Sequence, residues 1–308
     1  MSAPSRPPEP AGPCGRFAPT PSGPLHSGSL LAAVGSYLSA RQANGRWLLR
    51  IEDLDRNRIV PGVAEQMLRT LEAFGFEWDG IVEFQSHRIP NYELALERLS
   101  AAGLCYACRC SRSQIAAQSL EPGEELVYQG TCRNDPEASQ GPHALRFRTV
   151  ALPAEVDFVD RLQGPVREDC HHKAGDFVIR RRDCFFAYHL AVVVDDELQG
   201  VTEVVRGCDL LSSTARQILL QQALGYRTPA YAHLPLLLEA DGQKLAKSRH
   251  AVPLDAARAG PALWEALSWL RQEPPAELAD AAVREIWAWA LPSWRPAQLA
   301  GCRELRLA

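Results

Sequence analysis

Residues 19–29, with the sequence PTPSGPLHSGS, are rich in glycine, serine and proline and carry one histidine. They join a short apolar strand, predicted within residues 15–22, to a helix that we expect to begin near Ser27, a favourable N-cap. Amides at a helix N-terminus lie at the positive end of its dipole, where phosphates bind. His26 can donate to a phosphate, and Gly28 permits close backbone approach. The segment fits a phosphate site, although a plain connector is the alternative.

A second segment suited to phosphate lies far along the chain. Residues 243–248, QKLAKS, place Lys244 and Lys247 three residues apart, directly after Asp241 and Gly242. A flexible loop with two lysines can close over a triphosphate and offset the charge that develops on phosphorus and pyrophosphate. Alone, such a loop is usually a solvated turn. Two separate phosphate segments in one chain favour a nucleotide-binding enzyme.

Four cysteines crowd into 28 residues, at Cys105, Cys108, Cys110 and Cys132. Thiolate-rich loops at such spacing suit tetrahedral zinc, which would be structural because no open water position is needed. The chain has nine cysteines, an odd number, and begins with a proline-rich segment rather than an apolar export signal. This combination predicts reduced thiols and a cytoplasmic protein rather than a disulfide framework. A cluster without metal is the alternative.

Alternating helix and strand signals position the first phosphate segment. Residues 27–45 have helical spacing and stop at Asn44-Gly45, residues 46–53 form a buried apolar strand, and residues 63–76 form a helix that ends at Gly75. Strands separated by single helices pair in parallel with right-handed crossovers. The fold class predicted is therefore α/β with a parallel sheet.

The pattern changes after residue 104, where cysteines, turn residues and short β-like pieces predict an insertion. Strand signals return in residues 176–196 and 201–207, and a helix over 213–225 precedes a strand and loop over 231–248. The tail carries five of the seven tryptophans, which fits helix packing. The predicted division is a disordered leader (1–14), the first half of a nucleotide-binding catalytic domain (15–104), an insertion (105–175), the second half of that domain (176–250) and a C-terminal helical region (251–308).

The formal net charge of −4 means that the whole molecule does not present a positive field of the kind that holds nucleic acid by itself. Local basic patches must therefore hold any RNA partner, although a solvated surface is the alternative for each patch. No apolar run approaches the length of roughly 18 residues expected of a membrane span, so no membrane partner is predicted. The two candidate patches are Arg180, Arg181 and Arg182, and Arg109, Arg112 and Arg133 around the cysteines.

The two phosphate segments resemble the signatures of one enzyme family. The sequence RFAPTPSGPLHSGS is similar to the glutamyl branch of the class I aminoacyl-tRNA synthetase HIGH motif, with Ser29 at the position of its last histidine. QKLAKS resembles the KMSKS loop of the same class, with departures at its second and third positions. The segment RIED at residues 50–53 is also similar to glutamyl enzymes. The chain thus resembles the glutamyl-Q tRNA(Asp) synthetases, shortened relatives of the glutamyl-tRNA synthetases.

This resemblance implies a class I synthetase Rossmann-like sheet and a pocket for L-glutamate, whose two carboxylates and one ammonium call for arginine forks and one acid. A surface ion pair is the alternative for Arg16 or Glu52 alone, and a core aromatic is the alternative for Tyr188. The implied glutamate-binding residues are Arg16, Phe17, Ala18, Pro19, Thr20, Glu52, Tyr188 and Arg206. The implied catalytic residues are His26, Gly28, Ser29, Lys244 and Lys247, of which His26, Gly28 and Lys247 would bind ATP.

The resemblance also makes residues 105–175 an inserted zinc-binding and acceptor subdomain, and it implies the zinc ligands. In the family, a Cys-x-Cys pair and a downstream Tyr-x3-Cys hold one zinc ion, and this sequence matches them with Cys108, Cys110, Tyr128 and Cys132. Cys105 competes with Tyr128 for the fourth place, because a thiolate is an easier ligand than a phenol with a pKa near 10.

The implied activity is ATP-dependent activation of glutamate, followed by transfer to the queuosine base at the wobble position of tRNA(Asp). Mg²⁺ bound with ATP is a chemical expectation. A full glutamyl-tRNA synthetase continues into a large anticodon-binding region, whereas only a short segment follows Ser248 here. The alternatives are charging of a tRNA 3′ end and a non-catalytic RNA-binding or regulatory protein of the same fold.

Overall fold

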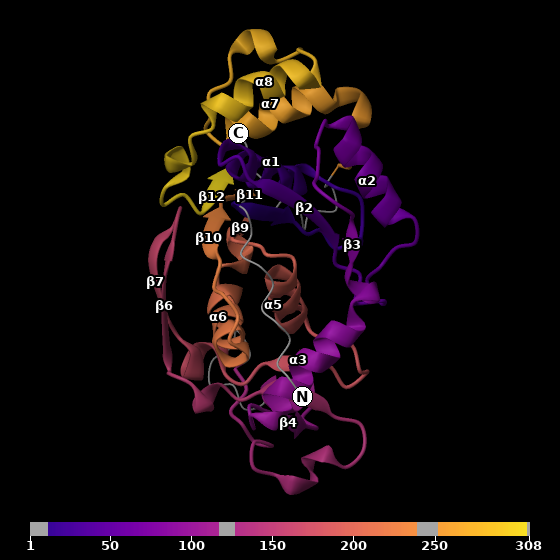
Figure 1. Cartoon of the computed structure of the whole chain (residues 1–308), viewed down its shortest axis with the longest axis vertical. Helices are drawn as coiled ribbons and strands as arrows, with labels where there is room; N and C mark the ends of the chain where they lie inside the picture. The colour runs from indigo at the N-terminus through magenta and orange to yellow at the C-terminus, as the bar shows by residue number, and fades with distance from the viewer. Residues whose placement is uncertain (1–11, 117–126, 239–251, 307–308) are drawn as a thin grey trace.

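The computed structural model describes residues 12–116, 127–238 and 252–306. These residues form an elongated molecule with a parallel sheet and its helices in the middle (Figure 1). Helices α7 (Ala259–Trp269) and α8 (Val283–Ser293) lie at one end, and strand β4 (Cys105–Cys108) lies at the other. The predicted α/β fold with a parallel sheet is confirmed. Lys244 and Lys247 fall outside the described residues, as do residues 1–11.

The first half of the sheet contains strands β1, β2 and β3, all parallel. The helix α1 connects β1 to β2 and begins at Ser27, as expected, but its N-cap is His26 rather than Ser27. Gly35 lets α1 lie close to the sheet, since a Cβ atom there would come within 2.6 Å of Leu234. The elements of this half are β1 (Cys14–Phe17), α1 (Ser27–Gln42), β2 (Arg46–Ile51), α2 (Val63–Ala73), β3 (Glu83–Phe84) and α3 (Ile89–Ala101).

The second half adds strands in the order β7-β6-β10-β9. Backbone and side-chain hydrogen bonds of 2.8 Å between Cys14 and Thr202 join β1 to the start of β9, so the two halves meet at the middle of the sheet. Parallel pairing joins β10 to both β9 and β6. The elements are β8 (Val178–Arg180), α5 (Tyr188–Leu198), β9 (Glu203–Gly207), α6 (Ser213–Leu224), β10 (Ala230–Leu234) and β11 (Leu236–Leu238).

The strand predicted through residues 188–196 is wrong, because this segment is the helix α5. Three consecutive valines favoured a strand, and β-branched residues do have that preference. Residues 190–196 are all buried, so they show neither the alternation of a surface strand nor the apolar stripe of a surface helix. A short apolar run of this kind is ambiguous in sequence, and tertiary packing decides its conformation.

The predicted C-terminal helical region is present and packs on the first half of the domain. Trp287 on α8 makes edge contacts with Tyr37 and Phe76, at ring-centroid distances of 5.0 and 5.2 Å. Its indole also donates to the backbone oxygen of Phe74 at 2.9 Å. The tail therefore supports the sheet that carries the first phosphate segment. Its elements are α7 (Ala259–Trp269), α8 (Val283–Ser293) and β12 (Glu304–Arg306), of which β12 pairs in parallel with β11.

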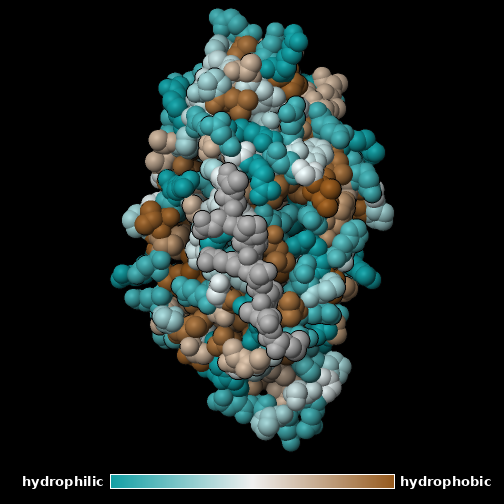
Figure 2. Space-filling view, in the orientation of Figure 1, coloured by the Kyte–Doolittle hydropathy of each residue, from teal (hydrophilic) through white to brown (hydrophobic). Residues whose placement is uncertain are grey.

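The segment predicted as an insertion contributes to two sheets. Strands β4 and β5 form a small antiparallel sheet with β8, whereas β6 and β7 form a hairpin at the edge of the main sheet. No helix among the described residues is long and apolar enough to cross a bilayer. Hydrophilic residues are interspersed with apolar ones on the face drawn in Figure 2. The elements are β4 (Cys105–Cys108), α4 (Arg112–Ala116), β5 (Ala144–Phe147), β6 (Glu155–Asp160) and β7 (Gly164–Asp169).

Candidate active site

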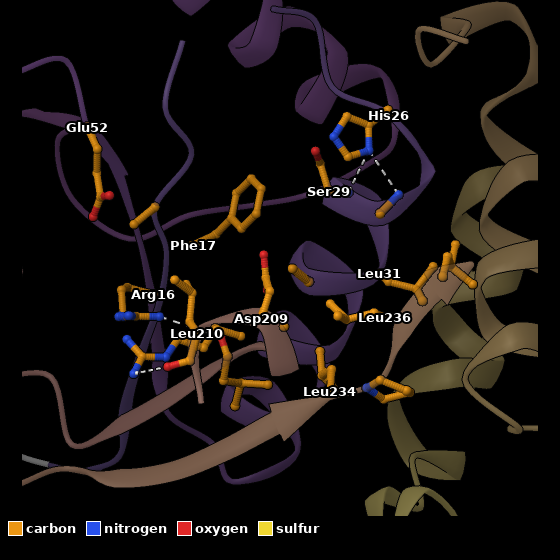
Figure 3. Close-up of a pocket in the computed structure, with 18 of the residues that line it drawn as sticks. Arg16, Phe17, His26, Ser29, Leu31, Glu52, Asp209, Leu210, Leu234 and Leu236 are labelled. Carbon is orange, nitrogen blue, oxygen red and sulfur yellow. Dashed lines mark hydrogen bonds between the residues drawn. The ribbon is translucent and has the colours of Figure 1, made fainter. Parts of the chain in front are cut away.

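A cavity of about 290 Å³ lies where strands β1 and β9 end beside the N-terminus of α1 (Figure 3). Ligands bind at this position in open α/β sheets, outside the carboxyl ends of the strands. Pro19 and Thr20 are absent from the lining formed by the described residues. The amide of Glu52 donates to Pro19 O at 3.0 Å, so this turn fixes the end of β2 instead. The lining includes nine predicted residues: Arg16, Phe17, Ala18, His26, Gly28, Ser29, Glu52, Tyr188 and Arg206.

His26 caps the helix that points into this cavity. Its Nδ1 accepts hydrogen bonds from the amides of Gly28 and Ser29, at 3.1 and 3.4 Å (Figure 3). Burial lowers the pKa of the imidazole, so the ring is neutral and carries its proton on Nε2. No acidic residue occupies the first turn of α1. The cavity therefore meets a positive helix end and one imidazole N–H donor, which together suit a phosphate.

Arg206 lies on β9, is only 5% exposed and is held by several acceptors. Its Nη1 donates to Gln217 Oε1 at 2.8 Å, and its Nη2 donates to Thr214 Oγ1 at 2.9 Å. A longer contact of 3.4 Å joins Nη1 to Tyr188 Oη, which also lines the cavity. The Tyr188 contact is the weakest of the three, so a substrate carboxylate can replace it at the lowest cost.

Two buried residues on neighbouring strands, His233 on β10 and Asp160 on β6, hold Arg206 in place. Arg206 Nε donates to His233 Nε2 at 3.0 Å, and His233 Nδ1 contacts Asp160 Oδ2 at 2.5 Å. Because Nε2 accepts, the imidazole carries its proton on Nδ1 and donates it to the carboxylate. Burial lowers the pKa of His233, and the Arg206 charge acts in the same direction, which keeps the ring neutral. The pair fixes one tautomer and thereby the orientation of the guanidinium.

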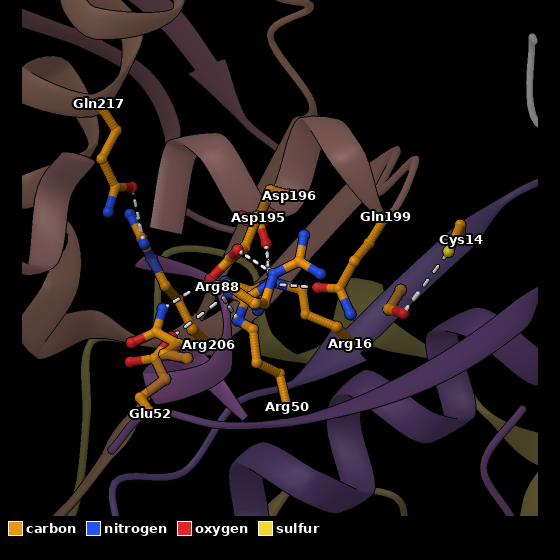
Figure 4. A network of polar contacts seen from close by, with 12 residues as sticks. Cys14, Arg16, Arg50, Glu52, Arg88, Asp195, Asp196, Gln199, Arg206 and Gln217 are labelled. Carbon is orange, nitrogen blue, oxygen red and sulfur yellow. Dashed lines mark hydrogen bonds and ion pairs between the residues drawn. The ribbon is translucent and has the colours of Figure 1, made fainter. Parts of the chain in front are cut away.

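Arg16 and Glu52 belong to a buried ionic network (Figure 4). Both are no more than 9% exposed, so neither forms a surface ion pair. Arg16 Nε and Arg50 Nη1 share Asp196 Oδ1, at 3.3 and 2.8 Å. Arg50 also reaches Glu52 at 3.3 Å and Gln199 at 2.6 Å. Burial raises the pKa of Glu52 to about 7 despite the opposing effect of Arg50 and Arg16.

The neighbouring carboxylate of Asp195 extends the network away from the cavity. Asp195 is fully buried and accepts hydrogen bonds from Gln85, Arg88 and Tyr92 at 2.6 to 2.9 Å. Arg50 Nε lies 3.8 Å from the same carboxylate. Buried charges need partners of this kind because their desolvation is costly. The network therefore ties β2, α3 and α5 together beneath the pocket.

The residues that position the lining side chains were not identified from the sequence. The acidic pair at residues 195–196 did carry a signal, because two carboxylates directly after an apolar run imply buried cationic partners. Arg50 begins the RIED segment but was not assigned a role, and the other supporting residues lie on strands and helices far apart in the chain, with no local motif. The unpredicted supporting or lining residues include Arg50, Asp160, Asp195, Asp196, Asp209, Thr214, Gln217 and His233.

The predicted cysteine cluster brings together three of its four thiols. The sulfur atoms of Cys108, Cys110 and Cys132 lie within 4.8 Å of one another. Tyr128 Oη lies 3.6 Å from Cys110 Sγ and accepts the amide hydrogen of Cys132 at 2.7 Å. These spacings fit a tetrahedral metal site, whose metal–sulfur bonds are about 2.3 Å.

Cys105 lies outside this cluster. Its sulfur is 3.0 Å from Ser100 Oγ. Cys105 and Cys108 lie three residues apart on β4, and side chains at that offset point to opposite faces of a strand. The geometry thus leaves Tyr128, and not Cys105, beside the three thiols.

Burial opposes ionisation within the cluster. It raises the pKa of Cys110 and that of the Tyr128 phenol. Burial also acts on Cys132, but hydrogen bonds, led by that of Tyr128, lower its pKa to about 7. One thiol is thus ready to ionise near neutral pH, and a bound cation would favour ionisation of the others.

Comparison with known proteins agrees with this geometry. Residues 14–258 match the family described as tRNA synthetases class I (E and Q), catalytic domain. The glutamyl-Q tRNA(Asp) synthetase of Aromatoleum aromaticum is 52% identical over 280 residues, which cover 91% of this chain and 88% of the relative. The chain belongs to the glutamyl-Q tRNA(Asp) synthetase family. The Geobacter sulfurreducens member of this family is 50% identical and covers 97% of the chain and 96% of its own length.

Solved structures share the fold of this synthetase family member. The glutamate-tRNA synthetase of Elizabethkingia anophelis superposes with a TM-score of 0.78 at 24% identity, covering 96% of this chain and 68% of that one. A glutamate tRNA ligase from Elizabethkingia meningosepticum, in complex with its amino acid, gives a TM-score of 0.75 at 23% identity and covers 96% and 67% of the two chains. These likenesses establish the class I synthetase architecture.

Proposed function

We propose that this enzyme activates L-glutamate with ATP and transfers it to the queuosine base of tRNA(Asp), in the cytoplasm. The observation that carries the first step is the charge pattern of the cavity, where two buried arginines face one buried carboxyl group. Arg16 and Arg206 would hold the carboxylates of glutamate, and ionised Glu52 would accept its ammonium. Tyr188 would share the carboxylate bound by Arg206.

The nucleotide would lie across the N-terminus of α1. His26 Nε2–H and the positive end of the α1 dipole would meet its phosphates, and Lys244 and Lys247 would approach from the second segment. A carboxylate oxygen of glutamate then attacks the α-phosphorus, forming glutamyl-adenylate as pyrophosphate leaves. Mg²⁺ would accompany ATP. Positioning and charge stabilisation supply the catalysis, and no side-chain nucleophile is required.

The acceptor assignment is supported by the relatives named glutamyl-Q tRNA(Asp) synthetase. In the second step the acceptor bonds to the glutamyl carbonyl carbon, and AMP leaves. The same adenylate could instead be transferred to a tRNA 3′ end, which makes the acceptor the point that experiment must decide.

We also propose that Cys108, Cys110, Cys132 and Tyr128 hold one structural zinc ion. Their donor set supports this assignment, since three thiols and one phenol converge and supply the four ligands of a closed tetrahedral site. Zinc would supply the positive charge that permits ionised ligands in a buried site, and would join β4 to the following loop.

Locating labelled glutamate on the RNA tests the proposed function. The enzyme is incubated with ATP, [¹⁴C]glutamate and tRNA(Asp) that carries queuosine, and the RNA is digested with nucleases and resolved by acid gel. Label on the anticodon fragment is expected, together with no label on tRNA(Asp) that has guanine at the same position. Label on the 3′-terminal adenosine would assign the enzyme to ordinary charging. A complete lack of label would favour the alternative of a non-catalytic RNA-binding protein.

A further inference from the structure

We propose that an arginine-lined pocket beside the cysteine cluster binds the phosphate backbone of the acceptor RNA. The pocket has a volume of about 530 Å³ and lies between α4, β5 and the turn after β8. This inference rests on the proposed function, because it assigns a place to the RNA partner of that reaction. The side chains that carry it are Arg112, Arg146, Arg181 and Arg182.

The pocket unites the two basic patches that the sequence separates. Arg112 belongs to the patch around the cysteines, and Arg181 and Arg182 belong to the patch about 70 residues later. The guanidinium of Arg182 donates to the backbone oxygen of Arg109, which fixes the two patches side by side. Four arginines and a single acid, Asp183, line the pocket of a chain whose net charge is −4. The formal charge of the lining is therefore positive, opposite in sign to the net charge of the chain.

Arg146 gives the pocket a hydrogen-bond donor that other residues of the protein hold in place. Its side chain is only 7% exposed, and its Nη1 donates to the Asp176 backbone oxygen at 2.7 Å. The guanidinium stacks on the Tyr128 ring at 3.9 Å, which fixes its plane. Its Nε has no hydrogen-bond partner among the described residues. A phosphate oxygen in the pocket would accept a charge-assisted hydrogen bond from this guanidinium, which its contacts with Asp176 and Tyr128 hold in place.

The pocket lies close to the glutamate cavity. Arg181 Nη1 contacts Asp55 Oδ2 at 3.0 Å, and Asp55 follows Glu52 by three residues. Three residues span at most about 11 Å. A polynucleotide whose backbone occupies the arginine pocket therefore has neighbouring nucleotides within reach of an adenylate beside Glu52. This proximity favours an RNA strand over an unrelated small anion.

Charge reversal at the two exposed arginines, Arg112→Glu and Arg182→Glu, tests the proposal. Binding of tRNA(Asp) carrying queuosine is measured by filter retention at several salt concentrations, alongside glutamate-dependent ATP–pyrophosphate exchange without RNA. Each variant is expected to bind RNA about tenfold more weakly and to lower the salt slope by about one. Exchange should stay at the wild-type level, which reports an intact fold and active site.

Arg69→Glu, on the exposed side of α2, is the matched control and should leave RNA affinity unchanged. Wild-type RNA affinity in both pocket variants, or an equal loss in the Arg69 variant, would overturn the inference. Failure of the proposed function is a separate result, because it appears as a lack of exchange or transfer in the wild-type enzyme whatever the pocket variants do to RNA binding.

Discussion

The glutamate cavity and the cysteine cluster both gather ionisable side chains, but the chain compensates their charges differently. In the cavity, Arg16 and Arg50 share Asp196, and Arg206 is braced by neutral acceptors. In the cluster, burial raises the pKa of Cys110, and three thiols lie within 4.8 Å of one another. The protein's own ion pairs and hydrogen bonds thus organise the cavity, whereas an added cation is required for all the ligands of the cluster to ionise.

Removing the arginine fork should have the largest effect. Arg206→Ala is expected to lower kcat/KM for glutamate in ATP–pyrophosphate exchange by about a hundredfold or more, because a buried charge partner is lost. Arg206→Lys should recover little, since an ammonium cannot make the contacts with Gln217, Thr214 and His233 at once. Exchange at the wild-type rate in Arg206→Ala would remove this residue from the substrate site.

Substitutions in the cysteine cluster should change the zinc content of the protein rather than the rate of adenylate formation. Cys110→Ser is expected to lose most of its bound zinc, by elemental analysis, and to transfer glutamate to RNA poorly while exchange changes little. Cys105→Ser is the matched control and should keep about one zinc per chain, because its sulfur pairs with Ser100 instead. Zinc loss from the Cys105 variant, or none from the Cys110 variant, would contradict the ligand assignment.

Acidification should weaken glutamate binding. Glu52 has a pKa of about 7 and must be ionised to accept an ammonium, so the apparent KM for glutamate rises as pH falls through 7. The rise approaches tenfold per pH unit below that value. Glu52→Gln should bind weakly at every pH, with a flat profile between pH 6 and 8. A wild-type KM that is constant over this range would show that Glu52 does not contact the ammonium.

The smallest effect is expected at His233, which orients Arg206 through a hydrogen bond. His233→Ala is expected to raise KM for glutamate about tenfold with a smaller change in kcat, because the lost hydrogen bond orients the fork without touching substrate. His172→Ala, at an exposed histidine, is the control and should have no effect. A fall in kcat alone would indicate a role for His233 other than positioning.

The sequence predicted the parts of the site that are encoded locally. The turn after β1, the start of α1 and the cysteine spacing are each visible within about ten residues, because turn chemistry and helix capping act over short distances. The contact of Arg16 with Asp196 spans 180 residues, and only the folded sheet brings these side chains together. The helix α5 was missed because its all-round burial removes the periodicity that distinguishes a helix from a strand.

The capping role of His26 shows a further limit of sequence reasoning. The sequence indicated a phosphate donor at this position and Ser27 as the N-cap. In the structure one ring nitrogen caps α1, so only Nε2 is left to face a ligand. The choice depends on backbone angles at the turn, which residue type alone does not determine.

Glutamate-dependent ATP–pyrophosphate exchange is the most direct test of the central claim, that the buried arginine and carboxyl pattern activates a dicarboxylic amino acid. The wild-type enzyme is assayed with each of the twenty amino acids, with and without tRNA. We expect label to enter ATP with glutamate and not with glutamine or aspartate. Exchange that depends on a different amino acid, or no exchange with any amino acid under either condition, would contradict the account.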